Sequence, residues 1–160
     1  MQRTLRTVAI PLSIFRSFVG RQPFLKIAVA CIDSLEPHFP QPWQLTVQPH
    51  GSTGSKTFGV LLQAGREETQ PTGLIELMFQ EDDTVLIPTL FLPREFHHQG
   101  AMIGALGRAV TEAEIINYRV IVCNLVPSQL RRLLNRGARE IPNREAVELH
   151  GGMNFLSSNV

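Results

Sequence analysis

Hydrophobic and polar residues alternate along several short stretches of the chain, which is the pattern of half-buried β-strands. Residues 43–47 and 74–80 follow it clearly, and in the second stretch Glu76 and Met78 share the less apolar face. Residues 84–92 form a strand-length apolar run. The stretches that we expect to be strands are residues 4–10, 43–47, 58–63, 74–80, 84–92, 119–124 and 147–149.

Other stretches have apolar residues at helical spacing, with proline near the start or glycine at the end. In the last of these we expect the leucines to be buried and Arg131, Arg132 and Arg136 to face outward, toward solvent, phosphate or an acidic partner. The predicted helices are residues 11–20, 23–36, 101–116 and 127–136.

The helix predicted over residues 101–116 combines an apolar stripe with a row of glycines, Gly100, Gly104 and Gly107, on the opposite side. Each interior glycine costs about 1 kcal/mol of helix stability relative to alanine. The row therefore suggests close approach by a cofactor, another element or a partner subunit, and a solvated face is the alternative. The residues expected to face the core are Met102, Leu106, Ala109, Val110 and Ala113.

Residues 84–92, the polar loop 93–100 and the following helix predict a strand–loop–helix unit with Gly100 at the turn. The first turn of a helix has free N–H groups, and the helix dipole favours negative charge there. Such a unit can hold a phosphate.

The composition is that of an ordinary globular chain, with 160 residues, 43% hydrophobic and 18% charged. We treat residues 1–160 as a single domain able to bury a core without disulfides. The net charge of +1 gives no global attraction to nucleic acid. Before Asp33 the chain has basic but no acidic residues. This charge pattern is explained either by a folded segment with an exposed basic face or by a transit peptide.

No stretch approaches the roughly 20 apolar residues of a membrane span, so we expect no membrane association. Cys31 and Cys123 lie in apolar runs. This is typical of small buried thiols in a reducing compartment, and we expect a cytoplasmic protein.

Several familiar sites are absent from the sequence. Residues 51–57 approach a nucleotide-binding loop, but Ser55 stands where the pattern needs a glycine before Lys56. His97 and His98 have no other His or Cys three or four residues away, which argues against a zinc site. There is no nucleophile-elbow pattern for a serine hydrolase.

The strand–loop–helix unit resembles the GNAT superfamily of acyl-CoA-dependent N-acyltransferases. In that family a bulged central strand leads into a loop of pattern Gln/Arg-x-x-Gly-x-Gly/Ala, which wraps the pyrophosphate of acyl-CoA. Residues 97–102 stand at this place, and Gly100 fits the first glycine. His97 replaces the usual Gln or Arg, and Met102 replaces the second small residue.

The resemblance implies a GNAT-like mixed α/β (α+β) fold, with a mostly antiparallel sheet flanked by helices in the order β-α-α-β-β-β-α-β-α-β. Pro88 would lie at the family's bulge, where its missing N–H is tolerated. Leu133 occupies the position of a tyrosine that often protonates the departing thiolate, and Ala138 follows Gly137 where phenylalanine is usual. This Gly-Ala pair is similar to GNAT-like proteins of some tailed phages.

The resemblance also implies acetyl-CoA as cofactor and an amine as acceptor. Backbone of the strand end would line the pantetheine arm and polarise the thioester carbonyl, and helix N–H groups would hold the diphosphate. Glu76 is the best-placed general base, with an ordinary exposed position as the alternative. The residues implied in cofactor binding are Phe91, Leu92, His97, Gln99, Gly100, Ala101, Met102 and Asn124.

Two functions follow from the resemblance. The first is an acyl-CoA-dependent N-acyltransferase. The second is a GNAT-shaped protein without catalysis, with a structural, assembly or binding role toward a protein partner or a second copy of the chain, such as a phage virion or accessory protein. A third interpretation is an α/β domain unrelated to the family. It would be favoured if the strands that contain Val85 and Val120 stayed paired instead of separating.

Overall fold

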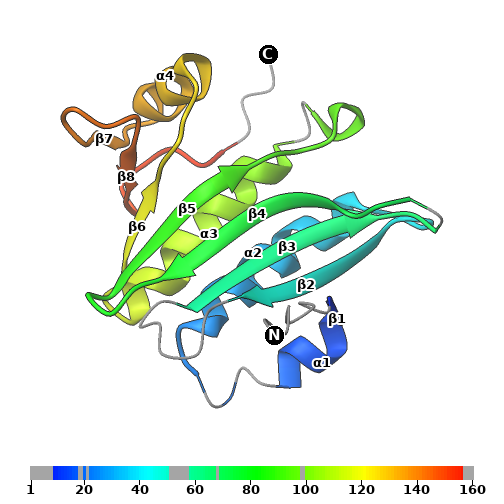
Figure 1. Cartoon of the computed structure of the whole chain (residues 1–160). Helices are drawn as coiled ribbons and strands as arrows, with labels where there is room; N and C mark the ends of the chain where they lie inside the picture. The colour runs from blue at the N-terminus through cyan, green and yellow to red at the C-terminus, as the bar shows by residue number, and fades with distance from the viewer. Residues whose placement is uncertain are drawn as a thin grey trace, which may run out of the picture.

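An open sheet of eight strands, in the spatial order β1-β2-β3-β4-β5-β6-β8-β7, forms the centre of the computed structural model (Figure 1). β5 and β6 are parallel, and the other neighbouring strands are antiparallel. The predicted mixed α+β fold with a mostly antiparallel sheet is therefore confirmed. The structure describes residues 9–17, 20, 22–50, 58–67, 69–97 and 100–156.

The elements alternate between strands and helices along the chain. The strands are β1 (Ile10–Pro11), β2 (Gln44–His50), β3 (Phe58–Gly65), β4 (Thr72–Phe79), β5 (Thr84–Leu90), β6 (Arg119–Val122), β7 (Arg139–Glu140) and β8 (Val147–Leu149). The helices are α1 (Leu12–Ser17), α2 (Leu25–Leu35), α3 (Ala101–Ile115) and α4 (Pro127–Asn135), with short 3-10 turns η2 (Glu36–His38) and η3 (Arg94–Phe96).

The element order differs from the expected one in the first half of the chain. Four strands, β2 to β5, lie between α2 and α3, where the resemblance implied three. Pro11 lies in β1, where it pairs with Thr46 of β2, and not in the first turn of a helix. Most of the strand predicted over residues 4–10, and the whole of the glycine-rich segment 51–57, lie outside the described residues.

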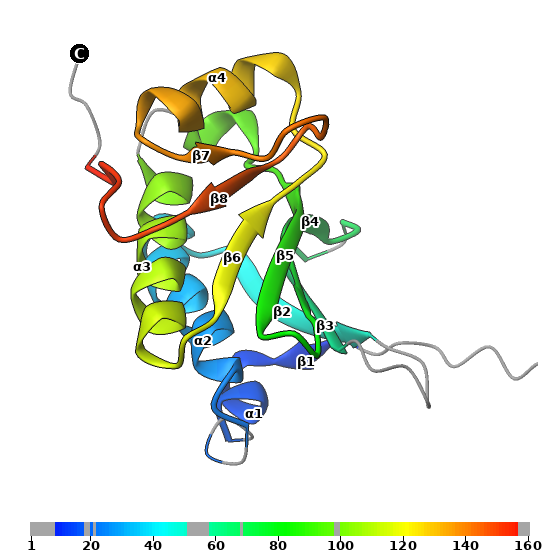
Figure 2. The same ribbon diagram turned by 90° about the vertical axis from the view of Figure 1, so that its left-hand side faces the viewer.

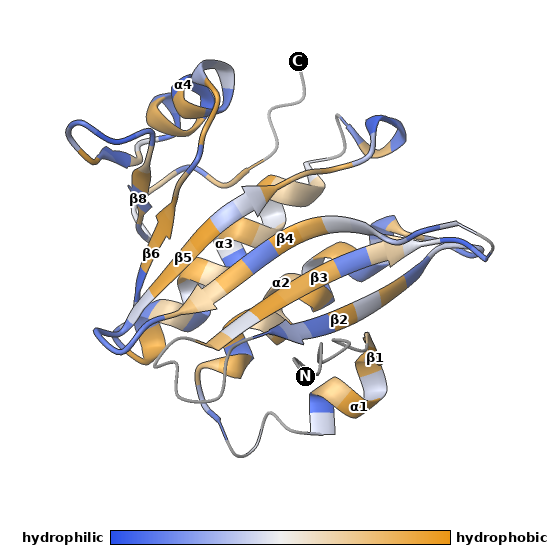
Figure 3. Cartoon of the chain, viewed as in Figure 1, coloured by the Kyte–Doolittle hydropathy of each residue, from blue (hydrophilic) through white to orange (hydrophobic). Residues whose placement is uncertain are grey.

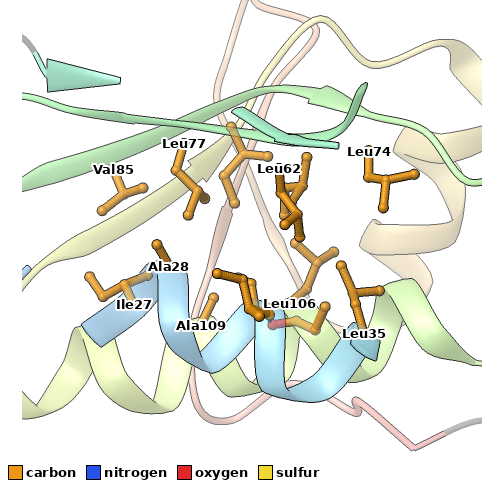
Figure 4. Close-up of a cluster of buried hydrophobic side chains, with 14 of the residues drawn as sticks. Ile27, Ala28, Leu35, Leu62, Leu74, Leu77, Val85, Leu106 and Ala109 are labelled. Atoms are coloured by element: carbon orange, nitrogen blue, oxygen red, sulfur yellow. The ribbon is translucent and has the colours of Figure 1, made fainter. Parts of the chain in front are cut away.

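α2 and α3 lie side by side on one face of the sheet (Figure 2). Figure 4 shows their side chains meeting those of the strands, and Figure 3 shows the apolar positions recurring along these elements. Each fully buried large side chain contributes about 1.5–3 kcal/mol to folding. The residues of this interface labelled in Figure 4 are Ile27, Ala28, Leu35, Leu62, Leu74, Leu77, Val85, Leu106 and Ala109.

The glycine row on α3 is covered by other parts of the same chain. A Cβ on Gly107 would lie 2.9 Å from Cβ of Phe155, and a Cβ on Gly104 would lie 3.3 Å from the Ser34 hydroxyl oxygen. Of the alternatives left open by the sequence, approach by another element is therefore the one that the structure supports for these two glycines.

These two glycines predict opposite effects on stability. Gly104→Ala should raise Tm by about 2–4 °C, because alanine adds about 1 kcal/mol of helix propensity and the Ser34 hydroxyl can rotate away. Gly107→Leu should lower Tm, because its side chain needs the space that Phe155 fills. Scanning calorimetry measures both changes, and a rise for both variants would contradict the packing role of Phe155.

Two side chains on the helices differ from the prediction. Met102 is only half-buried, and Ala101 and Ala105 take its place in the buried stripe, since the stripe follows the α2 side of the helix. Arg136 does not face outward freely. Its guanidinium donates to the carbonyl oxygens of Asn154 and Leu156, at 3.1 and 2.7 Å, because the C-terminal segment folds back on α4.

Candidate functional site

The parallel strands β5 and β6 separate at one end. Their pairing runs from Thr84–Arg119 to Ile87–Val122, and the N–H of Cys123 then donates to the Ile87 carbonyl at 3.0 Å. Beyond this bond β5 continues to Leu90, while the chain after β6 turns away toward α4 (Figure 1). The facing edges of both strands therefore lose their ladder partners, and we call this place the strand opening.

A bulge in β5 lies directly beside the strand opening. Glu76 pairs with Thr89, but Met78 pairs with Leu86, so β5 has one residue more than β4 between these pairs. Pro88 falls within the extra segment, where its missing N–H breaks no ladder bond. Because side chains alternate along a strand, the extra residue moves Thr89 onto the same face as Glu76.

The loop after β5 is held by hydrogen bonds with β4 and with the side chain of His97. The N–H of Phe91 donates to the Leu74 carbonyl at 2.7 Å, so it is not free to polarise a ligand carbonyl. The imidazole Nε2 of His97 donates to the Leu92 carbonyl at 2.6 Å. Phe91 itself is 50% exposed, and Leu92 packs partly against the core. The hydrogen bond from the ring of His97 therefore fixes the loop. The Leu92 N–H has no backbone acceptor among the described residues.

The N-terminus of α3 follows this loop. Gly100 has φ 67°, in the left-handed region, and provides no side-chain cap. The first helical bond runs from the Gly104 N–H to the Gly100 carbonyl at 2.9 Å. The N–H groups of Ala101 and Met102 precede it and have no intrahelical acceptor. Gln99, which the resemblance assigned to the cofactor, lies outside the described residues.

Asn124 lies on the β6 side of the strand opening. It adopts φ 55° directly after Cys123 and is exposed. Both residues line a cavity of about 330 Å³ whose floor is Leu86 and Ile121. Asn124 therefore follows β6, on the other side of the strand opening from the chain that continues β5, which includes Phe91 and Leu92.

A polar cluster spans the face of the sheet opposite α2 and α3. Oε1 of Glu76 lies 3.0 Å from Nε2 of His50, and the Thr89 hydroxyl donates to Oε2 of Glu76 at 3.2 Å. His50 Nε2 is shielded from solvent, and its contact with Glu76 is close but poorly aligned as a hydrogen bond. The Glu76 side chain is 24% exposed, so it is neither free in solvent nor buried.

Gly59 makes the contact between His50 and Glu76 possible. It pairs with His50 across β2 and β3, and a Cβ on it would overlap the imidazole ring. Only a residue without a side chain lets the ring cross β3 and reach the carboxylate on β4.

Cys123 connects this cluster to the cavity. Burial, and secondarily the negative charge of Glu76, raise the pKa of the Cys123 thiol above its ordinary value. The sulfur is therefore a neutral thiol near neutral pH. Leu86, which also lines the cavity, pairs with Met78, and Glu76 lies two residues from Met78 on the same face of β4.

The two thiols should differ in reactivity. Cys31 is fully buried, and burial raises its pKa to about 12, so we expect it to resist iodoacetamide until the chain unfolds. Cys123 is partly exposed and should react slowly in mildly alkaline buffer. Mass spectrometry of the labelled peptides measures this difference, and labelling of Cys31 before Cys123 in the folded protein would contradict it.

Sequence reasoning identified Glu76 but missed its partners. The strand predicted over residues 43–47 stops short of His50, whereas His50 is the last residue of β2. Two signals were present: Thr46, Gln48 and His50 continue the polar alternation of the strand, and a glycine inside a strand indicates close approach of another group. Pro88 did indicate a bulge in this strand, and the structure has one there. The sequence did not indicate that the bulge brings Thr89 to Glu76.

Comparisons with known proteins return no match in models of protein families, in curated proteins or in solved structures. Among the described residues, no helix has the length and apolar character needed to span a bilayer. The same residues contain no group of three or more His, Cys, Asp or Glu side chains arranged to hold a metal ion.

Proposed function

We propose that this chain is an acyl-CoA-dependent N-acyltransferase of the GNAT type that transfers an acetyl group to an amine. The observation that carries the proposal is the strand opening with its adjoining bulge at Pro88, placed beside the glycine-led N-terminus of α3. Parallel strands that separate beside a helix N-terminus offer an extended ligand two sets of unpaired backbone groups at once.

The residues around the opening fit acetyl-CoA. The N–H groups of Ala101 and Met102, which have no intrahelical acceptor, suit the diphosphate, and Gly100 adds no side chain at the start of the helix. The exposed ring of Phe91 suits the apolar part of the pantetheine arm. With the Phe91 N–H bonded to Leu74, the Leu92 N–H is the group left to polarise the thioester carbonyl.

When bound, acetyl-CoA supplies an activated acyl group. The acceptor ammonium must lose a proton before its nitrogen can attack, and Glu76 is placed to receive it at a carboxylate oxygen. His50 and Thr89 contact both oxygens of Glu76 and hold it in one orientation. The departing thiolate has no tyrosine beside it, so its proton comes from solvent.

Leu133 favours a second candidate function. It is a buried hydrocarbon at the place where the family has its proton-donating tyrosine. We therefore keep the alternative that the chain is a catalytically inactive GNAT-shaped protein with a structural, assembly or binding role. In that case the exposed Phe91 and Val126 would contact a protein partner or a second copy of the chain.

The neutral, partly buried thiol of Cys123 and the buried thiol of Cys31 suit a reducing compartment, and we propose the cytoplasm as the location.

A transfer assay with acetyl-CoA and a panel of amines tests the proposal. We expect an acetylated amine, detected by mass spectrometry, and release of free CoA thiol in equal amount. Acetyl-CoA binding without transfer to any amine would favour the inactive alternative. A chain that neither binds acetyl-CoA nor transfers the acetyl group would contradict both.

A further inference from the structure

The cavity between the sheet and the segment before β8 is lined by two exposed charged residues, Arg144 and Glu145. The sheet contributes the apolar Leu86 and Ile121, which we call its floor. Its volume of about 330 Å³ lies at the lower end of the range for small-molecule pockets. The space therefore suits a small ligand with an apolar part.

The cavity adjoins the proposed base. Leu86, which lines it, pairs with Met78 on β4, and Glu76 lies two residues from Met78 on the same face of the sheet. A molecule in the cavity is therefore near the carboxylate that would take a proton from an amine. The cavity also begins where β5 and β6 separate, since Cys123 makes the last bond between them.

Arg144 makes no ion pair or side-chain hydrogen bond with the described residues, although it lines this cavity. A guanidinium presents paired N–H donors that match a carboxylate. Glu145 is also without a side-chain partner among these residues, and its negative charge disfavours a ligand with two carboxylates.

We propose that this cavity binds the acyl acceptor, and that the acceptor is a small α-amino acid with one carboxylate and an apolar side chain. Arg144 holds the carboxylate, the floor of Leu86 and Ile121 takes the side chain, and the amine points toward Glu76. This assignment depends on the proposed acyl transfer for its catalytic meaning, but binding in the cavity does not require acetyl-CoA.

Protection of Cys123 from iodoacetamide tests the proposal without acetyl-CoA. Phenylalanine should slow labelling of Cys123 in a saturable way. Phenethylamine, which lacks the carboxylate, and glutamate, which carries a second one, should need at least about tenfold higher concentration for equal protection. Equal protection by phenylalanine and phenethylamine, or none by either, would overturn the assignment.

Arg144→Gln should raise the phenylalanine concentration for half-protection by about tenfold or more. Arg131→Gln, at an exposed position on α4 that does not line the cavity, is the matched control and should leave protection unchanged. If phenylalanine protects Cys123 but no acetyl transfer occurs, the acyltransferase function fails while the binding site stands. If transfer occurs with amines that lack a carboxylate as efficiently as with phenylalanine, the acceptor class is wrong while the acyltransferase stands.

Discussion

Replacing Glu76 by glutamine is expected to lower kcat for acetyl transfer by about 10²–10⁴-fold, the usual contribution of a general base. Glutamine has the shape of glutamate, and its amide oxygen can still accept from the Thr89 hydroxyl. It cannot accept a proton from the acceptor ammonium. The chain should therefore stay folded and keep its affinity for acetyl-CoA while the chemical step slows.

Steady-state kinetics with acetyl-CoA measures this loss. Glu148→Gln is the matched control, because Glu148 is also a partly exposed strand glutamate with an ion partner, Arg119 at 2.8 Å. Removing that exposed pair should cost at most about 1 kcal/mol of stability and leave kcat unchanged. Equal activity of wild type and Glu76→Gln would remove Glu76 from the mechanism.

Gly100→Val should weaken acetyl-CoA binding by about tenfold or more. Gly100 has φ 67°, a conformation that costs a residue with a side chain about 1–2 kcal/mol, and more for a β-branched one. In the free protein the loop of this variant would relax to another conformation. Binding of acetyl-CoA would have to restore the left-handed conformation at residue 100, and the strain of that conformation would be subtracted from the binding free energy. The branched side chain would also stand beside the N–H groups that should meet the diphosphate.

Gly137→Ala is the matched control for backbone strain. Gly137 also has a positive φ, 103°, but it ends α4 and a Cβ there meets no atom closer than 3.8 Å. Its replacement should lower Tm and leave the Kd for acetyl-CoA unchanged. Acetyl-CoA affinities that do not differ among wild type, Gly100→Val and Gly137→Ala would exclude the α3 N-terminus as the diphosphate site.

The strands and helices were predictable because their signals are local. Alternation places Leu77 and Phe79 on the buried face of β4, and helical spacing places Leu106 and Val110 on the buried face of α3. Each signal lies within a single element, so one sequence is sufficient to read it.

The candidate site was less predictable because its contacts join distant elements. The contact of His50 with Glu76 crosses a third strand and depends on the absence of a side chain at Gly59. Thr89 faces Glu76 only because of the bulge, which changes the alternation of β5. Pro88 is a local sign of the bulge. The register of neighbouring strands, which decides which side chains meet there, has no such local sign.

The glycine row of α3 illustrates an intermediate case. The sequence indicated that something approaches the helix backbone there, which is a local property of Gly104 and Gly107. It did not indicate that Phe155, far along the chain, fills the space beside Gly107.

Isothermal titration of the full chain with acetyl-CoA tests the central claim most directly, namely that the strand opening and the α3 N-terminus together hold this molecule. We predict saturable binding at one site per chain, weaker for acetyl-pantetheine, which lacks the diphosphate. At a hundredfold excess over Kd, bound acetyl-CoA should stabilise the fold by about 2.7 kcal/mol and raise Tm accordingly. Absence of both binding heat and a Tm shift at millimolar acetyl-CoA would contradict the account.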